Sequence, residues 1–186
     1  MAKLVLYTFG NLLQPRDHEQ IQGFHDRNPF VYTSAENTPG FVDRSGNSWK
    51  RDHADREDDW GTREVSPRFL TGAEHRDAPA TLSVWEDVES VYAFTYNGFH
   101  AEVLTKRDEW FVKGDWPAYV AWWISDDHIP TRTEGAERLE RLHDNGPTAY
   151  SFDFKAPFDA EGQPLRMDRQ KIQEASKIVQ SHMRPE

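Results

Sequence analysis

The sequence predicts an α+β fold of the ferredoxin-like kind, in which an antiparallel sheet carries two helices on one face. The apolar residues switch between a step of two, typical of strands, and a step of three to four, typical of helices. In chain order, the first six segments are strand, helix, strand, strand, helix, strand, which is the βαββαβ order of that fold. The 186 residues are enough for one domain with a proper core.

The N-terminal segments supply a strand, a helix and a second strand. Residues 3–9 alternate along an expected strand, and Gly10 ends it. The next segment has a helical step, but Pro29 has no N–H group to donate. We therefore expect the helix to kink or restart there, with Asn28 as a new N-cap. Residues 41–46 are expected to form a short second strand.

Residues 46–79 are dense in charge and show little periodicity, which predicts a long loop. Its aromatic residues indicate that it is tied to the domain: Trp49, Trp60 and Phe69. A metal site is conceivable from its remaining polar residues: Asp52, His53, Asp55, Glu57, Asp58 and Asp59. None of these pairs has the fixed spacing that a helix or strand would impose, so we favour solvated charges.

The stretch from residue 81 to 125 is the expected nucleus of the fold. A strand over residues 81–86 is followed by Asp87, which is a suitable N-cap. Apolar residues from Val88 to Leu104 recur at three- and four-residue steps, and this predicts one helix of roughly five or six turns. The aromatic and β-branched run at the end of the stretch predicts the next strand.

The C-terminal part adds a helix, a strand and a last helix to this core. Thr131 or Thr133 is expected to cap the third helix, which ends at the Asn-Gly-Pro sequence of residues 145–147. Residues 149–154 alternate as a strand. A short amphipathic helix near the C-terminus, around Ile172 to Val179 in sequence, needs a partner surface.

Composition limits the partners and the location of the protein. The 32 acidic and 22 basic residues give a net charge of −10, which argues against nucleic acid or an anionic membrane as a partner. The absence of cysteine excludes disulfides, zinc thiolate sites and thiol nucleophiles. No stretch has the pattern of a signal peptide or a membrane span, so we expect a cytoplasmic protein. We expect one domain over residues 1–159 and a tail over residues 160–186.

Aromatic residues make up 13% of the chain and include seven Trp. We expect the sheet face opposite the two helices to carry an aromatic set that is too apolar for water: Tyr7, Trp85 and one of Trp122 or Trp123. A second copy of the same sheet, related by a two-fold axis, would cover this face most simply. The sequence therefore predicts a homodimer.

Residues 85–100, WEDVESVYAFTYNGFH, resemble the pattern W-[ED]-D-x-E-[SA]-…-A-[FH]-…-S-x-H-F of antibiotic-biosynthesis-monooxygenase-like proteins in the dimeric α/β-barrel superfamily. Over roughly residues 3–159, the chain resembles a bacterial family of that superfamily that is described only as a domain of unknown function. The resemblance implies a ferredoxin-like dimer with a pocket between the sheet and the helices. The long charged loop, the additional C-terminal elements and Gly98, in place of the Ser of the pattern, depart from the small monooxygenases.

The resemblance implies no single reaction, because a shared fold is a weak argument for shared chemistry. Relatives in the superfamily include cofactor-free monooxygenases, haem-degrading enzymes, haem-dependent dehydratases and peroxidases, lactone isomerases and polyketide cyclases.

Two histidines are candidates for chemistry. His100 can act as a general base, ligate haem iron, or hold a backbone carbonyl as a buried histidine. His128 follows two aspartates, and a carboxylate there could orient its ring, although we favour a plain turn. Tyr7 and Asn11 lie where relatives place a hydrogen-bonding group toward the substrate. The aromatic candidates for lining a pocket are Trp85, Tyr96, Trp122 and Trp123.

Three functions follow from these residues. The first is an enzyme that acts on a flat, largely apolar molecule, such as a polyketide or an aromatic phenol, by monooxygenation or by acid–base rearrangement or cyclisation in a secondary-metabolite type of pathway. His100 would be its base, and Tyr7 or His128 its donor. The second is a haem protein with His100 as the iron ligand, and the third is a non-catalytic dimer that binds a small molecule. We favour the first, without a cofactor.

Overall fold

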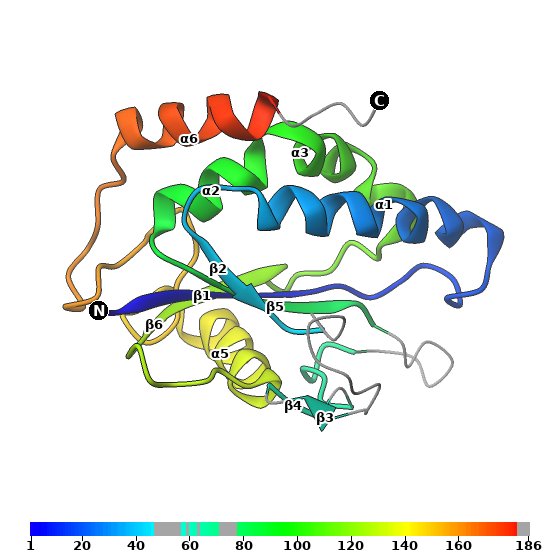
Figure 1. The fold of residues 1–186 in the computed structure, drawn as a ribbon. Helices are drawn as coiled ribbons and strands as arrows, with labels where there is room; N and C mark the ends of the chain where they lie inside the picture. The colour runs from blue at the N-terminus through cyan, green and yellow to red at the C-terminus, as the bar shows by residue number, and fades with distance from the viewer. Residues whose placement is uncertain (47–56, 59, 63, 71–77, 182–186) are drawn as a thin grey trace.

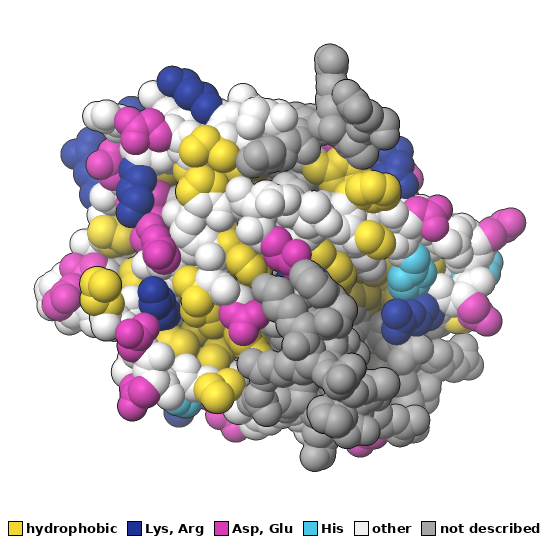
Figure 2. Space-filling model, in the orientation of Figure 1, with side chains coloured by type: hydrophobic (Ala, Val, Ile, Leu, Met, Phe, Trp, Pro, Cys, Tyr) yellow, Lys and Arg dark blue, Asp and Glu magenta, His cyan; other side chains and the backbone are white. Residues whose placement is uncertain are grey.

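The structure, a computed structural model, describes residues 1–46, 57–58, 60–62, 64–70 and 78–181. Within these residues the fold is α+β, with a four-stranded antiparallel sheet and six helices. The sheet lies in the middle of the molecule, with helices above and below it (Figure 1). On the face drawn in Figure 2, acidic and basic side chains are scattered between apolar ones.

The sheet has the strand order β2-β5-β1-β6, and each pair of neighbours is antiparallel. Its strands are β1 (Lys3–Phe9), β2 (Phe41–Arg44), β5 (Ala80–Trp85) and β6 (Tyr119–Ile124). In the two central registers, Tyr7 of β1 lies opposite Leu82 on one side and Val120 on the other. These four predicted strands are confirmed. A separate hairpin is formed by β3 (Glu57–Asp58) and β4 (Gly61–Thr62).

One face of the sheet is covered by helices that form two layers (Figure 1). These helices are α1 (Glu19–Glu36), α2 (Val88–Tyr96), α3 (Gly98–Thr105), α4 (Arg107–Trp110) and α6 (Arg169–Ser181). The strands turn every second side chain to this face, so Leu4 and Leu6 pack with Val88, Val91 and Phe94 of α2. The outer helix α6 packs on α2 and α3, which supplies the partner surface that the sequence requires.

Helix α1 is continuous, which corrects the expected restart at Asn28. Its N-cap is His18, whose Nδ1 accepts a hydrogen bond from the backbone N–H of Gln20 at 3.2 Å. Pro29 lies inside the helix on its exposed side and removes one backbone donor. Both halves of the helix are buried: Ile21, before the proline, packs with Leu12 and Trp110, and Ala35, after it, belongs to the core cluster of Leu4 and Leu6. Packing therefore outweighs the local cost of the proline.

The single long helix expected after Asp87 is also incorrect, because it is broken into α2 and α3. Asp87 is the N-cap as predicted and accepts from the N–H of Ser90 at 2.8 Å. The break has extended backbone at Asn97 and a positive φ of 60° at Gly98. A Cβ atom on Gly98 would lie 2.7 Å from Cγ1 of Val179, so α6 packs directly against the break.

Helix α5 (Arg132–Asn145) covers the other face of the sheet. Thr131, one of the two predicted caps, forms a capping box with Glu134, and Gly146 ends the helix. Trp60 and Phe69 join α5 in the core on this face. The prediction that these two side chains tie the long loop to the domain is confirmed. Trp49 lies outside the described residues.

The expected aromatic face of the sheet is correct for Tyr7 and Trp122 but wrong for Trp85. Trp85 pairs with Leu4, so it points to the helix face, where its ring stacks on Phe94 at 5.3 Å between centres. Helix α5 of the same chain shelters Tyr7 and Trp122. A second copy of the sheet is therefore not needed to bury this face, and the homodimer stays a prediction.

The extra strand expected over residues 149–154 is reduced in the structure to two isolated bridges, Ala121 with Phe152 and Thr148 with Ser151. Ala121 of β6 and Phe152 exchange backbone hydrogen bonds of 2.8 and 3.0 Å. Phe152 is completely buried, so side-chain packing rather than a strand ladder holds this segment. Among the described residues, no helix has both the length and the apolar character required to cross a membrane.

Replacing Gly135 by Ala should destabilise the protein by about 1–3 kcal/mol, because the added methyl would overpack the core. An ideal Cβ at this position would lie 2.5 Å from Cδ2 of Tyr7. Gly23→Ala in α1 is the matched control, since its Cβ would meet nothing closer than 3.4 Å. The control should gain about 0.5–1 kcal/mol of helix propensity. Urea unfolding of both variants measures the difference, and equal stabilities would contradict the close approach of α5 to β1.

Candidate functional site

The predicted site residues lie in three separate places. Tyr7 and Trp122 are buried between the sheet and α5, and Asn11 lies beside Phe69 just after β1. Four others lie on the side of the sheet covered by α1, α2 and α3: Trp85, Tyr96, His100 and Trp123. His128 lies in an exposed turn after β6. The sheet therefore separates His100 from Tyr7, and the structure does not assemble these residues into one constellation.

His100 is half-buried on α3 and holds the backbone at the end of α2. Its Nδ1 lies 2.9 Å from the carbonyl oxygen of Thr95, and its ring packs against Phe94 with centres 4.7 Å apart. Because the carbonyl can only accept, Nδ1 carries the proton and Nε2 keeps its lone pair. Burial lowers the pKa of His100 below its ordinary value and outweighs the opposite effect of this hydrogen bond. Of the three roles considered for His100, this contact fits that of a buried histidine that holds a backbone carbonyl.

His128 is oriented by a carboxylate, although by neither of the aspartates that precede it. Its Nε2 lies 3.0 Å from Oε1 of Glu134, which also takes part in the capping box of α5. The backbone N–H of His128 donates to the carbonyl of Ser125 at 3.1 Å, which closes the turn that the sequence favours. The ring is exposed, and its contact with Glu134 joins the turn after β6 to the N-terminal end of α5.

Three of the aromatic candidates have structural contacts. Trp85 is buried and donates from Nε1 to Oγ of Ser83 at 2.9 Å. Trp123 donates from Nε1 to the carbonyl of Phe158 at 2.7 Å and also lines an open hollow of about 460 Å³ at the end of β6. Tyr96 is 44% exposed and packs against the ring of Tyr92 with centres 4.7 Å apart.

The other three candidates carry polar atoms that have no hydrogen-bond partner among the described residues. These atoms are the hydroxyl of Tyr7, Oδ1 of Asn11 and Nε1 of Trp122, and their side chains are at most 2% exposed. The orientation of Asn11 is fixed, because its Nδ2 donates to the carbonyl of Phe69 at 2.8 Å. Buried polar groups are normally satisfied, so each exception requires an explanation.

Two arginines of α5 lie beside these atoms. Arg132 is buried and donates from Nη1 to the carbonyl of Gly61 at 2.5 Å. Its charge lowers the pKa of Tyr7, but burial has the larger effect and raises that pKa well above its ordinary value. Arg138 lies over the ring of Trp122 at 5.0 Å from its centre, and its Nε is buried without a partner.

Sequence reasoning missed Arg138. It lies beside Leu139 on the flank of the apolar stripe of α5, where an arginine usually reaches solvent. The only sequence signal was its position one turn after Gly135, the glycine that lets α5 approach the sheet.

The described residues contain no group of three or more acidic or histidine side chains that could hold a metal ion. The conceivable metal site of the long loop is not tested by this finding. Most of its residues lie outside the described part of the chain, and only the backbone of Glu57 and Asp58 is described.

The pKa of His100 leads to a prediction about stability and pH. A histidine that is harder to protonate in the folded state stabilises the protein above its ordinary pKa, and this stability is lost as the pH falls through that value. The unfolding free energy should therefore fall between about pH 7.5 and pH 5. His100→Asn keeps a side-chain N–H for the carbonyl of Thr95 but cannot titrate, so its profile should be flatter. Urea unfolding across this range measures both profiles, and parallel profiles would contradict the assignment.

The comparisons with known proteins identify a family but no function. A family model described as "Domain of unknown function (DUF3291)" matches residues 3–168. No curated protein and no solved structure gives a significant match. The match extends from the first residue of β1 to the residue before α6, and so includes the sheet, α5 and every predicted site residue. The chain therefore belongs to the DUF3291 family.

Proposed function

We propose that this protein binds a small, flat molecule in the layer between the sheet and α5, with Tyr7, Asn11 and Trp122 as its polar contacts. The supporting observation is that all three side chains are at least 98% buried and present a polar atom without a hydrogen-bond partner among the described residues. A buried hydroxyl, amide or indole N–H without a hydrogen bond costs about 1–3 kcal/mol. A ligand that satisfies these atoms would recover this cost.

The surroundings of these atoms favour a flat and largely apolar ligand. Trp60 and Phe69 are buried on this face of the sheet. The ring of Phe69 stacks on Trp116, with centres 5.8 Å apart and planes 8° apart. Sites for small molecules are commonly lined by aromatic side chains, with a few polar groups that set the orientation.

Binding fits this geometry better than acid–base catalysis does. The raised pKa of Tyr7 keeps its hydroxyl protonated at neutral pH, so this group donates or accepts a hydrogen bond and does not act as a base. His100, the base expected to act with Tyr7, contacts the carbonyl of Thr95 on the other side of the sheet, and His128, the alternative donor, contacts Glu134 in an exposed turn. Of the three functions that follow from the sequence, the small-molecule-binding protein therefore has the strongest support.

The superfamily assignment is part of this proposal. The elements β1, α1, β2, β5, α2 and β6 follow the βαββαβ order around an antiparallel sheet, which supports a ferredoxin-like core. A homodimer of the dimeric α/β-barrel kind would have to accommodate α5, which occupies the sheet face that a barrel would use.

Tyr7→Phe should weaken the binding of a planar phenol such as 1-naphthol by about tenfold, the value of one hydrogen bond. The same substitution should leave the unfolding free energy unchanged or slightly higher, because it removes a buried hydroxyl that has no partner. Tyr92→Phe on the opposite side of the sheet is the matched control and should bind like the wild type. Isothermal titration calorimetry measures the affinities. Equal binding by wild type and Tyr7→Phe, or no binding of 1-naphthol or indole by wild type, would overturn the proposal.

Haem binding at His100 is the second candidate, because one observation favours it. The bond from Nδ1 to the carbonyl of Thr95 fixes the ring and leaves Nε2 as the free nitrogen, as in a histidine that ligates a metal. Burial also favours the neutral, ligating form. The side chain therefore fits an axial ligand, and bound haem would supply oxygen or peroxide chemistry.

Added haem should give a Soret band with the wild-type protein if His100 is the ligand. His100→Ala should shift or abolish this band, whereas His128→Ala, the control with an exposed histidine, should leave it unchanged. An absorbance titration makes the measurement without any assay of activity. The same spectrum from all three proteins would rule out His100 as the ligand.

A further inference from the structure

Trp122 and Arg138 place two buried hydrogen-bond donors beside each other. The guanidinium carbon of Arg138 lies 5.0 Å from the centre of the Trp122 ring. Neither Nε1 of Trp122 nor Nε of Arg138 has an acceptor among the described residues, and both atoms are hidden from solvent. Both groups carry N–H and neither can accept, so they cannot satisfy each other. The pair requires an acceptor that the described residues do not provide.

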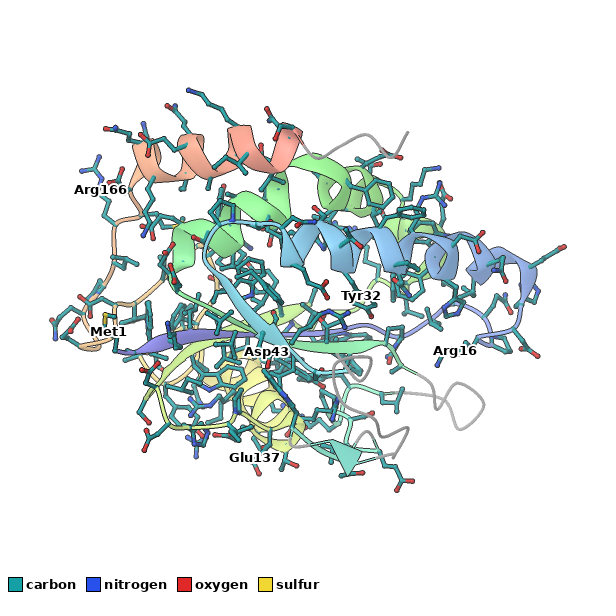
Figure 3. All side chains as sticks on the ribbon, viewed as in Figure 1. Met1, Arg16, Tyr32, Asp43, Glu137 and Arg166 are labelled. Atoms are coloured by element: carbon teal, nitrogen blue, oxygen red, sulfur yellow. The ribbon has the colours of Figure 1, made fainter. Side chains whose placement is uncertain are left out.

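The outer part of the Arg138 side chain is held in place. Nη1 donates to the carbonyl of Tyr150, and the guanidinium carbon lies 3.8 Å from the centre of the Tyr150 ring. Arg141 also approaches this ring, at 5.3 Å, but its side chain is exposed. Figure 3 marks the solvent side of α5 by the label at Glu137. The fixed guanidinium leaves Nε as the buried donor of an otherwise half-exposed side chain.

Donors outnumber acceptors in this layer. Tyr7 and Trp122 point to the same face, on neighbouring strands and two residues apart in register. Gly135 contacts Tyr7, and Arg138 follows one turn later on α5. Among the described residues, the unpartnered groups include two N–H groups that can only donate and the Tyr7 hydroxyl, which can donate or accept. The one group that can only accept is Oδ1 of Asn11, which lies four residues beyond Tyr7.

The positive charge of Arg138 favours a charged acceptor over a neutral one. Arginine stays protonated in proteins, so Arg138 keeps its positive charge although burial lowers its pKa. The charged groups that act on it are Glu134, Glu137 and Arg141. Neither glutamate accepts from Nε. Hydrogen bonds from a charged arginine are strongest to an anionic oxygen, and the guanidinium geometry suits a carboxylate.

We propose that the ligand is an aromatic carboxylate, whose carboxylate oxygens accept from Nε of Arg138 and Nε1 of Trp122 while its ring lies in the aromatic layer beside Tyr7. This inference rests on the proposed binding function and adds the chemical class of the ligand. Arg138 is the residue that selects a carboxylate over a neutral group of the same shape.

Benzoate and benzamide test this selection, because they have the same shape and differ in charge. Isothermal titration calorimetry at neutral pH should show that the wild-type protein binds benzoate at least about tenfold more tightly than benzamide. Arg138→Met keeps most of the apolar stem and should reduce this preference to near one. Arg138→Lys keeps the charge but lacks the Nε–H group, so it should keep only part of the preference.

Arg141→Met is the matched control, since it removes a neighbouring charge that also lies over Tyr150, and it should retain the full preference. Urea unfolding confirms that each variant is folded. An absence of preference in the wild type, or an unchanged preference in Arg138→Met, would overturn the inference. If 1-naphthol still bound in a Tyr7-dependent manner, the binding function would stand and only the ligand class would be wrong. If none of the probes bound, both proposals would fail.

Discussion

The close approach of α5 to the sheet is the constraint on which the rest of the structure depends. Gly135 lets the helix backbone touch the ring of Tyr7, and the capping box at Thr131 fixes where the helix begins. This packing buries one face of β1 and β6 within a single chain. It also buries more polar atoms than the described protein groups can bond. The Tyr7 hydroxyl and the Trp122 Nε1 are therefore left unpaired.

Local patterns in the sequence were sufficient to predict the four strands of the sheet and the N-caps of α2 and α5. Alternation identified β1 and β5, turn residues indicated where β2 begins, and aromatic and β-branched composition identified β6. The residue type at Asp87 identified the N-cap of α2, and Thr131 was one of two candidates for the N-cap of α5. The errors arose where a distant segment decides the local conformation. The break at Gly98 depends on contact with Val179 of α6, about eighty residues later, which no periodicity within α2 and α3 can reveal.

The candidate site was predictable in residue type but not in arrangement. Tyr7, Asn11 and Trp122 were suggested by their chemistry and by a resemblance to relatives, and the structure adds that each has an unpaired atom. His100 was suggested by the same resemblance, yet it lies beyond the sheet with its Nδ1 on a carbonyl. Arg138 was missed because the unpaired state of its Nε depends on how Tyr150 and Trp122 enclose it.

Unpaired buried groups lower stability, so a fold that retains several of them needs compensation elsewhere. The helix layer on the opposite face provides it: α6 buries Ala175 and Val179 against α2 and α3, and Lys171 pairs with Asp87 at 2.8 Å. These contacts lie on the opposite face of the sheet from Tyr7, so they stabilise the domain independently of the packing under α5. One face of the sheet can thus supply stability while the other retains the unpaired polar groups of Tyr7 and Trp122.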